Sequence, residues 1–224
     1  MAQITLVIGN QNYSSWSLRP WLFLAHHDIP FDCRKVQLFT DSMQRELAPY
    51  FSDNKVPVLL DGDLQVWDSL AILEYLAEKY PEKGGWPADP AVRAVARSVS
   101  AEMHSGLFAL RGELPMNCRR RFPGFTPGPD AQRDIERVQA VWAYCRDSHG
   151  GDGPWLFGDF SVADCMYAPV VMRLLSYEIE LDPVSDAYCR TLFDNGAMQR
   201  WIRAAEDEVE VILEDEADWP SEPF

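Results

Sequence analysis

The chain has 224 residues, 47% of them hydrophobic and 12% aromatic, which allows one large core or two smaller ones and argues against a disordered chain. Its formal net charge of −15 argues against sequence-independent nucleic-acid binding, because that binding needs a basic surface. The sequence has no apolar run of about 18 residues, which argues against a membrane span, and its first residues lack the basic segment that opens a signal peptide.

The first 80 residues predict the element order β-α-β-α-β-β-α. Apolar residues at helical spacing, from Leu18 to Ala25, indicate the first helix. Asp61-Gly62 stands between two β-rich runs, a pattern typical of a hairpin. The predicted strands cover residues 3–8, 31–36, 56–60 and 64–67, and the predicted helices cover 16–27, 42–49 and the stretch through residue 76 that begins at Asp68-Ser69.

Residues 81–90 are rich in proline and glycine and predict a domain boundary. We therefore expect an α/β domain over 1–80, a linker over 81–90 and an all-helical domain over 91–224. The predicted helices of the second part of the chain cover residues 90–117, 130–148, 161–177, 184–194 and 197–213.

Cysteine usage argues against a disulfide framework and against a zinc site. The five cysteines are scattered, odd in number and never in a Cys-x-x-Cys spacing. A reducing, cytoplasmic setting fits this usage best, with each thiol acting as a small buried hydrophobic group.

Charge is concentrated towards the end of the sequence. Residues 201–224 hold nine acidic side chains and one basic side chain. Such a run predicts a solvated helix face and tail rather than an acidic tail that binds a partner. Arg119-Arg120-Arg121 is a basic cluster, for which a solvated loop is favoured over an anion site.

Ser14 and Ser15 immediately precede the first predicted helix. A helix N-terminus presents unpaired N–H groups and a partial positive charge, both of which stabilise a thiolate. A serine hydroxyl at this point can also donate a hydrogen bond to a bound thiolate. The alternative is that either serine only caps the helix, since serine is a preferred cap residue.

Two further segments suggest ligand contacts. A cis bond before Pro57 would expose the backbone of Val56 for strand-like pairing with a peptide ligand, whereas the alternative is an ordinary trans proline at a strand start. Ser69 and the amides of the following helix start suit a ligand carboxylate, and Asp68 suits a ligand ammonium. A simple helix cap is the alternative there.

These three segments, followed by Phe160-Ser161-Val162-Ala163-Asp164, resemble the glutathione S-transferase superfamily over nearly the whole chain. The serine segment is similar to the motif of the zeta and related bacterial classes, and residues 160–164 look like the family's helix-capping box and hydrophobic staple. The resemblance implies a thioredoxin-like α/β domain followed by an all-helical domain. It also implies glutathione as co-substrate, no metal, a homodimer and a role in detoxification.

The resemblance assigns a role to each matching residue. Ser14 is the implied thiolate-activating hydroxyl, and Ser15 is the adjacent candidate. The implied glutathione-binding residues are Lys55 at the glycyl carboxylate, Val56 with Pro57 at the cysteinyl backbone, and Asp68 with Ser69 at the γ-glutamyl end. The implied acceptor-site residues, on the long helix from residue 90, are Met103, His104, Leu107, Phe108 and Arg111.

Two of the acceptor candidates have simpler explanations. His104 is more often a packed histidine than an acid–base catalyst, and Arg111 suits a helix salt bridge as well as an acidic acceptor. Trp16 also departs from the zeta pattern, which has cysteine at that position. This departure weakens the expectation of an isomerase of the maleylacetoacetate type and leaves glutathione binding intact.

The expected function is conjugation of the glutathione thiolate to a small electrophile, with no nucleic-acid or membrane partner. Two alternatives are a zeta-like glutathione-dependent isomerase and a non-catalytic glutathione-fold binding module. A thiol–disulfide oxidoreductase on the same fold would need a nucleophilic cysteine at the first helix start. Serine stands there instead, which argues against that activity.

Overall fold

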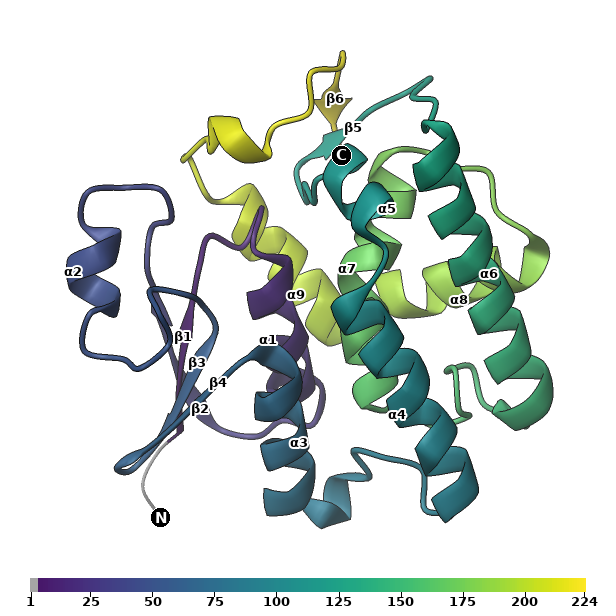
Figure 1. The fold of residues 1–224 in the computed structure, drawn as a ribbon, viewed down its shortest axis with the longest axis horizontal. Coiled ribbons are helices and arrows are strands. Elements are labelled where there is room, and N and C mark those ends of the chain that lie inside the picture. The colour runs from purple at the N-terminus through teal and green to yellow at the C-terminus, as the bar shows by residue number, and fades with distance from the viewer. Residues whose placement is uncertain (1–3) are drawn as a thin grey trace.

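A computed structural model of the chain describes residues 4–224, so Gln3 of the first predicted strand lies outside the described residues. The N-terminal part forms a sheet of four strands in the order β2-β1-β3-β4, in which β1 runs parallel to β2 and antiparallel to β3. The elements are β1 (Ile4–Ile8), α1 (Ser15–His26), β2 (Phe31–Lys35), α2 (Met43–Leu47), β3 (Val58–Asp61), β4 (Leu64–Trp67) and α3 (Ser69–Lys79). This confirms the predicted order and the thioredoxin-like fold (Figure 1).

Helices make up most of the rest of the chain and lie beside the sheet domain in Figure 1. They are α4 (Pro90–Ser105), α5 (Phe108–Glu113), α6 (Pro129–His149), α7 (Val162–Ser176), α8 (Pro183–Phe193) and α9 (Gly196–Glu206). The stretch between α3 and α4 contains a short 3₁₀ turn at Pro81–Lys83, and the domain boundary at 81–90 stays a prediction. Across residues 4–224, no helix combines the length and the apolar composition needed to cross a bilayer.

Alternate residues of β1 face two different layers. Leu6 and Ile8 join the large core that α1, α3 and α7 share, whereas Val7 packs with Val58 and with Leu47 of α2. Successive side chains of a strand point to opposite faces, so one short strand supports helices on both sides of the sheet.

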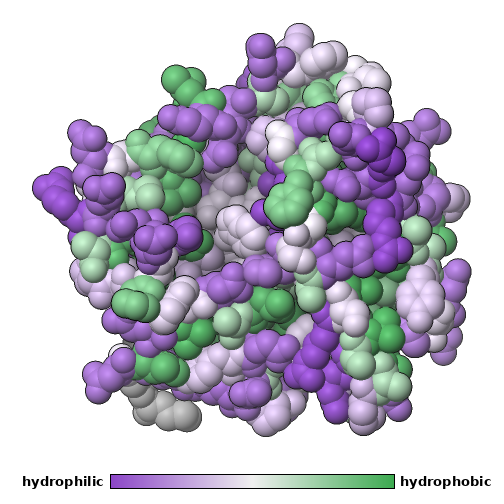
Figure 2. All heavy atoms as spheres, in the orientation of Figure 1, coloured by the Kyte–Doolittle hydropathy of each residue, from purple (hydrophilic) through white to green (hydrophobic). Residues whose placement is uncertain are grey.

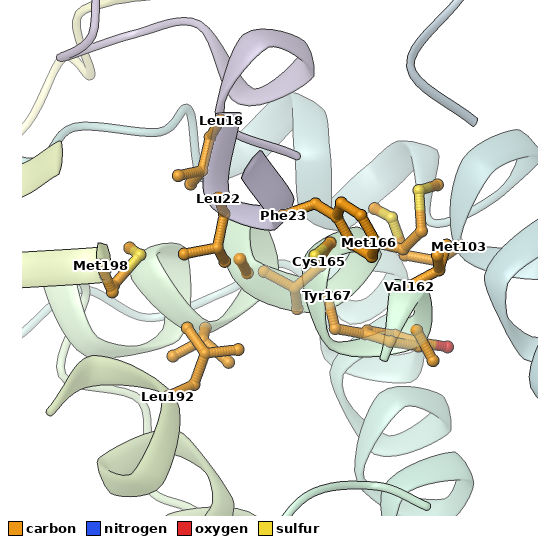
Figure 3. Packing of buried hydrophobic residues seen from close by; sticks show 14 of the residues in the cluster. Leu18, Leu22, Phe23, Met103, Val162, Cys165, Met166, Tyr167, Leu192 and Met198 are labelled. Atoms are coloured by element: carbon orange, nitrogen blue, oxygen red, sulfur yellow. The ribbon is translucent and has the colours of Figure 1, made fainter. Parts of the chain in front are cut away.

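The helix α1 is fixed by packing against the helical domain. Figure 3 shows Leu22 pointing towards Met198 of α9, and Phe23 lying against Met166 of α7. The side chains of Leu22 and Phe23 are fully buried. Burial of each is worth about 1.5–3 kcal/mol. Because α1 belongs to this common core, its N-terminus is held at a defined place between the two parts of the molecule.

The predicted helix over 90–117 is wrong as a single helix. Gly106 is extended, with φ −125° and ψ −158°, and Leu107 has a positive φ of 56°, so α4 ends and α5 begins in a new direction. Asp134 of α6 accepts hydrogen bonds from the backbone N–H groups of Ala109 and Leu110, each at 3.0 Å. These bonds satisfy two of the unpaired amides at the start of α5.

The predicted helix over 197–213 is also too long. Helix α9 ends at Glu206, and residues 207–224 continue as a C-terminal strap with a 3₁₀ turn at Leu213–Asp215. The strap ends in β6 (Glu222–Pro223), which pairs antiparallel with β5 (Arg120–Arg121). Figure 1 shows it in yellow, arching from α9 over to β5.

The expectation of a solvated arginine loop is wrong, because this segment contacts the tail, whereas five of the nine acidic side chains in 201–224 are exposed as expected. Glu208 is only 6% exposed. Arg120 donates to the hydroxyl of Ser221 at 3.1 Å, and Arg121 donates to the carboxylate of Glu222 at 2.7 Å. Opposite charges 101 residues apart in sequence are thus paired in space.

The start of α7 carries the capping box that the sequence predicts. The Asp164 carboxylate accepts a hydrogen bond from the backbone N–H of Ser161 at 2.8 Å and another from the Tyr188 hydroxyl at 3.0 Å. Burial raises the pKa of Asp164 to about 6, against the opposing effect of these bonds.

All five cysteines are free. Four are buried, as expected, and Cys33 is exposed, so the expectation of a buried thiol is wrong there.

Candidate active site

A cleft of about 730 Å³ opens beside the start of α3 and the turn that precedes β3. Its lining includes all five residues that the sequence predicts to bind glutathione, which are Lys55, Val56, Pro57, Asp68 and Ser69. Aromatic side chains complete the walls, namely Trp16, Phe39, Phe51 and Trp67. We call this the first cleft.

A second cleft of about 440 Å³ adjoins the first and shares Trp16, Leu38, Phe39 and Val56 with it. Both candidate serines line the second cleft, together with Phe108 and Arg111 of α5, Arg173 of α7 and Asp215 of the C-terminal strap. The face drawn in Figure 2 is hollowed between the sheet domain and the helical domain. The start of α1 therefore stands where the two clefts meet.

Ser14 is the residue before α1, and its side chain makes no helix-capping hydrogen bond. Its hydroxyl donates to the Ser17 hydroxyl oxygen at 2.7 Å, and that oxygen also accepts from the backbone N–H of Gly9 at 3.0 Å. Only 6% of Ser14 is exposed. The hydroxyl of Ser14 is thus held inside the turn and must rotate to donate to a ligand.

Ser15 is the first residue of α1 and has a different environment. Its hydroxyl oxygen accepts a hydrogen bond from the Arg173 guanidinium at 2.9 Å. This leaves the Ser15 O–H free to donate towards the cleft, because a hydroxyl has one donor besides its acceptor lone pairs.

Arg173 is the site residue that sequence reasoning missed. Its guanidinium is buried and also donates to the carbonyl oxygens of Leu114 at 2.7 Å and Pro169 at 3.1 Å. Burial, together with the nearby Arg111, lowers its pKa to about 10. The available signal was a single charged residue inside the apolar run of α7, where a charge is rarely placed without a partner.

The turn before β3 leaves backbone groups available. The Val56–Pro57 peptide bond is cis, as the family resemblance implies. Within residues 4–224, the N–H and C=O of Val56 take part in no turn, loop or cap hydrogen bond. Lys55 lies at the rim with 76% of its side chain exposed and pairs with Asp53 at 3.2 Å.

Asp68 and Ser69, at the start of α3, also line the first cleft. Asp68 has a positive φ of 71°, and its carboxylate accepts from the backbone N–H of Leu70 at 2.8 Å. Asp68 therefore caps α3, and its carboxylate also lies 3.1 Å from Nε2 of His104. Capping of α3 and the predicted binding of a ligand ammonium thus involve the same carboxylate.

Arg19 connects the start of α3 to α4 of the helical domain. Its buried guanidinium donates to the Ser69 hydroxyl at 3.1 Å and to the Met103 sulfur at 2.9 Å. The same guanidinium lies 4.2 Å from the centre of the Trp16 ring. Burial and the charges of Arg111 and Arg173 lower its pKa to about 9.

The five predicted acceptor residues separate into two groups. Phe108 and Arg111 line the second cleft. Met103 and Leu107 are buried, and His104 contacts Asp68 and the edge of Trp16 instead of lining that cleft. Burial lowers the pKa of His104, which Asp68 partly opposes. The break between α4 and α5 explains this separation, because it turns α5 and not the end of α4 towards the cleft.

The described residues contain no group of three or more His, Cys, Asp or Glu side chains arranged to hold a metal ion. The first cleft offers a ligand charged, hydroxyl and backbone groups, and the second offers hydroxyl groups, two guanidinium groups and a carboxylate.

Known proteins have a similar fold. Residues 13–79 match the family model described as the glutathione S-transferase N-terminal domain. A glutathione transferase homolog from Burkholderia, solved with bound glutathione, is 25% identical and superimposes with a TM-score of 0.69 over 92% of this chain and 98% of that chain. Residues 13–79 therefore belong to the glutathione S-transferase N-terminal domain family, and the chain as a whole is similar to glutathione S-transferases.

Two curated relatives cover most of the chain. A probable maleylacetoacetate isomerase of Caenorhabditis elegans is 26% identical over 172 residues, which are 76% of this chain and 79% of the relative. A maleylacetoacetate isomerase of Rattus norvegicus is 29% identical over 174 residues, which are 76% of this chain and 78% of the relative.

Proposed function

We propose that this chain is a glutathione transferase that joins the glutathione sulfur to a small electrophile. The observation that carries the proposal is that the two clefts share Trp16, which follows Ser14 and Ser15 of the second cleft at the N-terminus of α1. A thiol bound in the first cleft would meet a helix N-terminus and two hydroxyls on the side that faces the second cleft.

Glutathione would lie in the first cleft as an extended peptide. The unpaired backbone of Val56 supports strand-like pairing with the cysteinyl residue. Asp68 and Ser69, at the start of α3, would hold the ammonium and carboxylate of the γ-glutamyl end. Lys55 would approach the glycyl carboxylate from the rim.

The chemistry requires a thiolate near neutral pH. A free thiol has a pKa of about 8.5, so only a few per cent is ionised at pH 7. Lowering that pKa by about two units requires roughly 2.7 kcal/mol of stabilisation in favour of the thiolate. A hydroxyl donor and a helix N-terminus each supply on the order of 1 kcal/mol, and the cationic Arg111 and Arg173 in the second cleft add to it. The thiolate then attacks the electrophilic carbon, and the new carbon–sulfur bond forms as the bond to a leaving group breaks and that group departs with the electron pair.

Single variants distinguish which serine hydroxyl stabilises the thiolate. The family motif favours Ser14, and we expect Ser14→Ala to lower kcat/KM about 100-fold, since one donor at a developing charge is worth that much. Glutathione affinity, measured by calorimetry, should change far less. Intact turnover in Ser14→Ala together with its loss in Ser15→Ala would move the role to Ser15, whose O–H is free beside Arg173.

A zeta-like isomerase is the second candidate. The names of two relatives support it, as do the two cationic side chains of the second cleft, which suit an acidic acceptor. Isomerisation of maleylacetoacetate in the presence of glutathione, followed by its ultraviolet absorbance, distinguishes the two activities. A non-catalytic binding module would bind glutathione and turn over neither kind of substrate.

The homodimer, the cytoplasmic location and the role in detoxification stay predictions. Light scattering of the purified protein tests the first, and a monomer mass would contradict it.

A further inference from the structure

The C-terminal strap is anchored at its start to the loop that carries the serines. The carboxylate of Glu208 accepts hydrogen bonds from the backbone N–H groups of Gln11 at 2.8 Å and Asn12 at 3.0 Å. Lys35 of β2 adds an ion pair to the same carboxylate at 3.1 Å. The start of the strap therefore contacts the β1–α1 turn.

Further contacts fix the strap along its length. Arg119 donates to the backbone carbonyls of Glu208 and Glu210, and also to the Tyr13 hydroxyl at 3.0 Å. The Tyr13 hydroxyl in turn donates to the carboxylate of Glu216. At the far end, the backbone N–H of Phe224 donates to the Arg119 carbonyl at 2.8 Å.

These contacts hold the strap so that one of its carboxylates, that of Asp215, lies in the second cleft. Asp215 lies next to Glu216 and lines that cleft with Arg111 and Arg173. Among the described residues, no side chain hydrogen-bonds or ion-pairs with the Asp215 carboxylate. Burial raises its pKa, which the nearby Arg173 opposes. The second cleft thus carries a half-buried acidic group besides its two arginines.

We propose that Asp215 is a specificity-determining residue that selects the charge of the acceptor in the second cleft. Its carboxylate repels an anionic group on that side and accepts a hydrogen bond from a neutral or cationic donor group. A neighbouring charge in a partly desolvated cleft is screened much less than one in bulk water. The proposal rests on the proposed function for its catalytic consequence, while its effect on acceptor binding is independent of turnover.

The test compares Asp215→Asn with Glu214→Gln. Both variants remove one carboxylate from the same turn, but Glu214 is exposed and lies outside the cleft. The acceptors are chlorodinitrobenzene and chlorodinitrobenzoate, which differ by one negative charge. In both, the thiolate forms a carbon–sulfur bond as the carbon–chlorine bond breaks and chloride leaves. The readout is the ratio of kcat/KM for the benzoate to that for the neutral compound.

We expect Asp215→Asn to raise this ratio about tenfold and Glu214→Gln to leave it within about twofold of the parent. Equal ratios for the two variants would overturn the proposal. The Kd of the benzoate, measured by tryptophan fluorescence without glutathione, should tighten in Asp215→Asn by a similar factor.

This binding measurement separates the two possible failures. An unmodified protein that turns over neither acceptor contradicts the proposed function, yet a tighter benzoate Kd in Asp215→Asn still supports the role of Asp215. An unchanged Kd in a folded Asp215→Asn protein contradicts that role whatever the turnover.

Discussion

At the residue scale, the site depends on contacts between residues far apart in sequence. Ser15 receives a hydrogen bond from Arg173, and Ser69 receives one from Arg19. Both arginines are buried, and burial lowers the pKa of each. The serines could be predicted because they belong to short local motifs, whereas their partners could not, because no spacing in the sequence links residue 15 to residue 173.

Arg173→Lys tests the positioning of Ser15. Lysine keeps the charge but lacks the planar fork that contacts Ser15, Leu114 and Pro169 together. We expect kcat to fall about tenfold with a smaller change in glutathione Kd, because the hydroxyl loses its fixed orientation.

Arg111→Lys is the matched control, since Arg111 lines the same cleft and contacts neither serine. Equal losses of kcat in the two variants would mean that a guanidinium group at either position matters equally and that the Ser15 contact has no special role. Circular dichroism melts of both proteins verify that they are folded.

At the element scale, local patterns predicted the sheet and most helices, and they were wrong where a distant residue ends or redirects a helix. Asp134 of α6 holds the start of α5, which lies 25 residues earlier in the sequence. The apolar pattern runs through Gly106 without interruption and therefore predicted one long helix. The capping box of α7, in contrast, is entirely local, and it was predicted correctly.

The α7 capping box makes stability depend on pH. The folded-state pKa of Asp164 is about 6, above the 3.8 of an ordinary aspartate, so between these two pH values the native state binds more protons than the unfolded state. Stability contributed by this group is then present below the lower value and is lost as the pH rises through the upper one. The loss amounts to roughly 3 kcal/mol.

Asp164→Asn has no such proton to lose. We therefore expect the unfolding free energy of the parent, relative to that of Asp164→Asn, to fall between pH 4 and pH 7. Urea unfolding of both proteins at the two pH values measures this change. A difference that is the same at both pH values would mean that Asp164 titrates normally.

At the scale of the whole molecule, segments about 200 residues apart in the sequence meet at the site. The C-terminal strap contacts the β1–α1 turn through Glu208 and Glu216, and it pairs with the Arg119–Arg121 segment. Composition alone predicted solvation for both charged segments, because a count of charges contains no information on their partners. The strap therefore joins the sheet domain and the helical domain around the clefts.

Glu208→Ala tests this joining. The change leaves the N–H of Asn12 buried and without its partner, which costs about 1–3 kcal/mol of unfolding free energy. Lys35→Ala removes the exposed partner of the same carboxylate and should cost less than about 1 kcal/mol. Denaturant unfolding of the two variants measures both values, and equal costs would contradict a structural role of the Glu208 contacts with the turn.

The central claim is that the start of α1 stabilises a glutathione thiolate. The most direct measurement is the ultraviolet absorbance of the thiolate of bound glutathione, titrated against pH in the unmodified protein and in Ser14→Ala and Ser15→Ala. We predict that the bound thiol ionises about two pH units below the free thiol, whose pKa is about 8.5, and that one of the two variants loses most of this shift. Bound glutathione that ionises at the same pH as free glutathione would contradict the account.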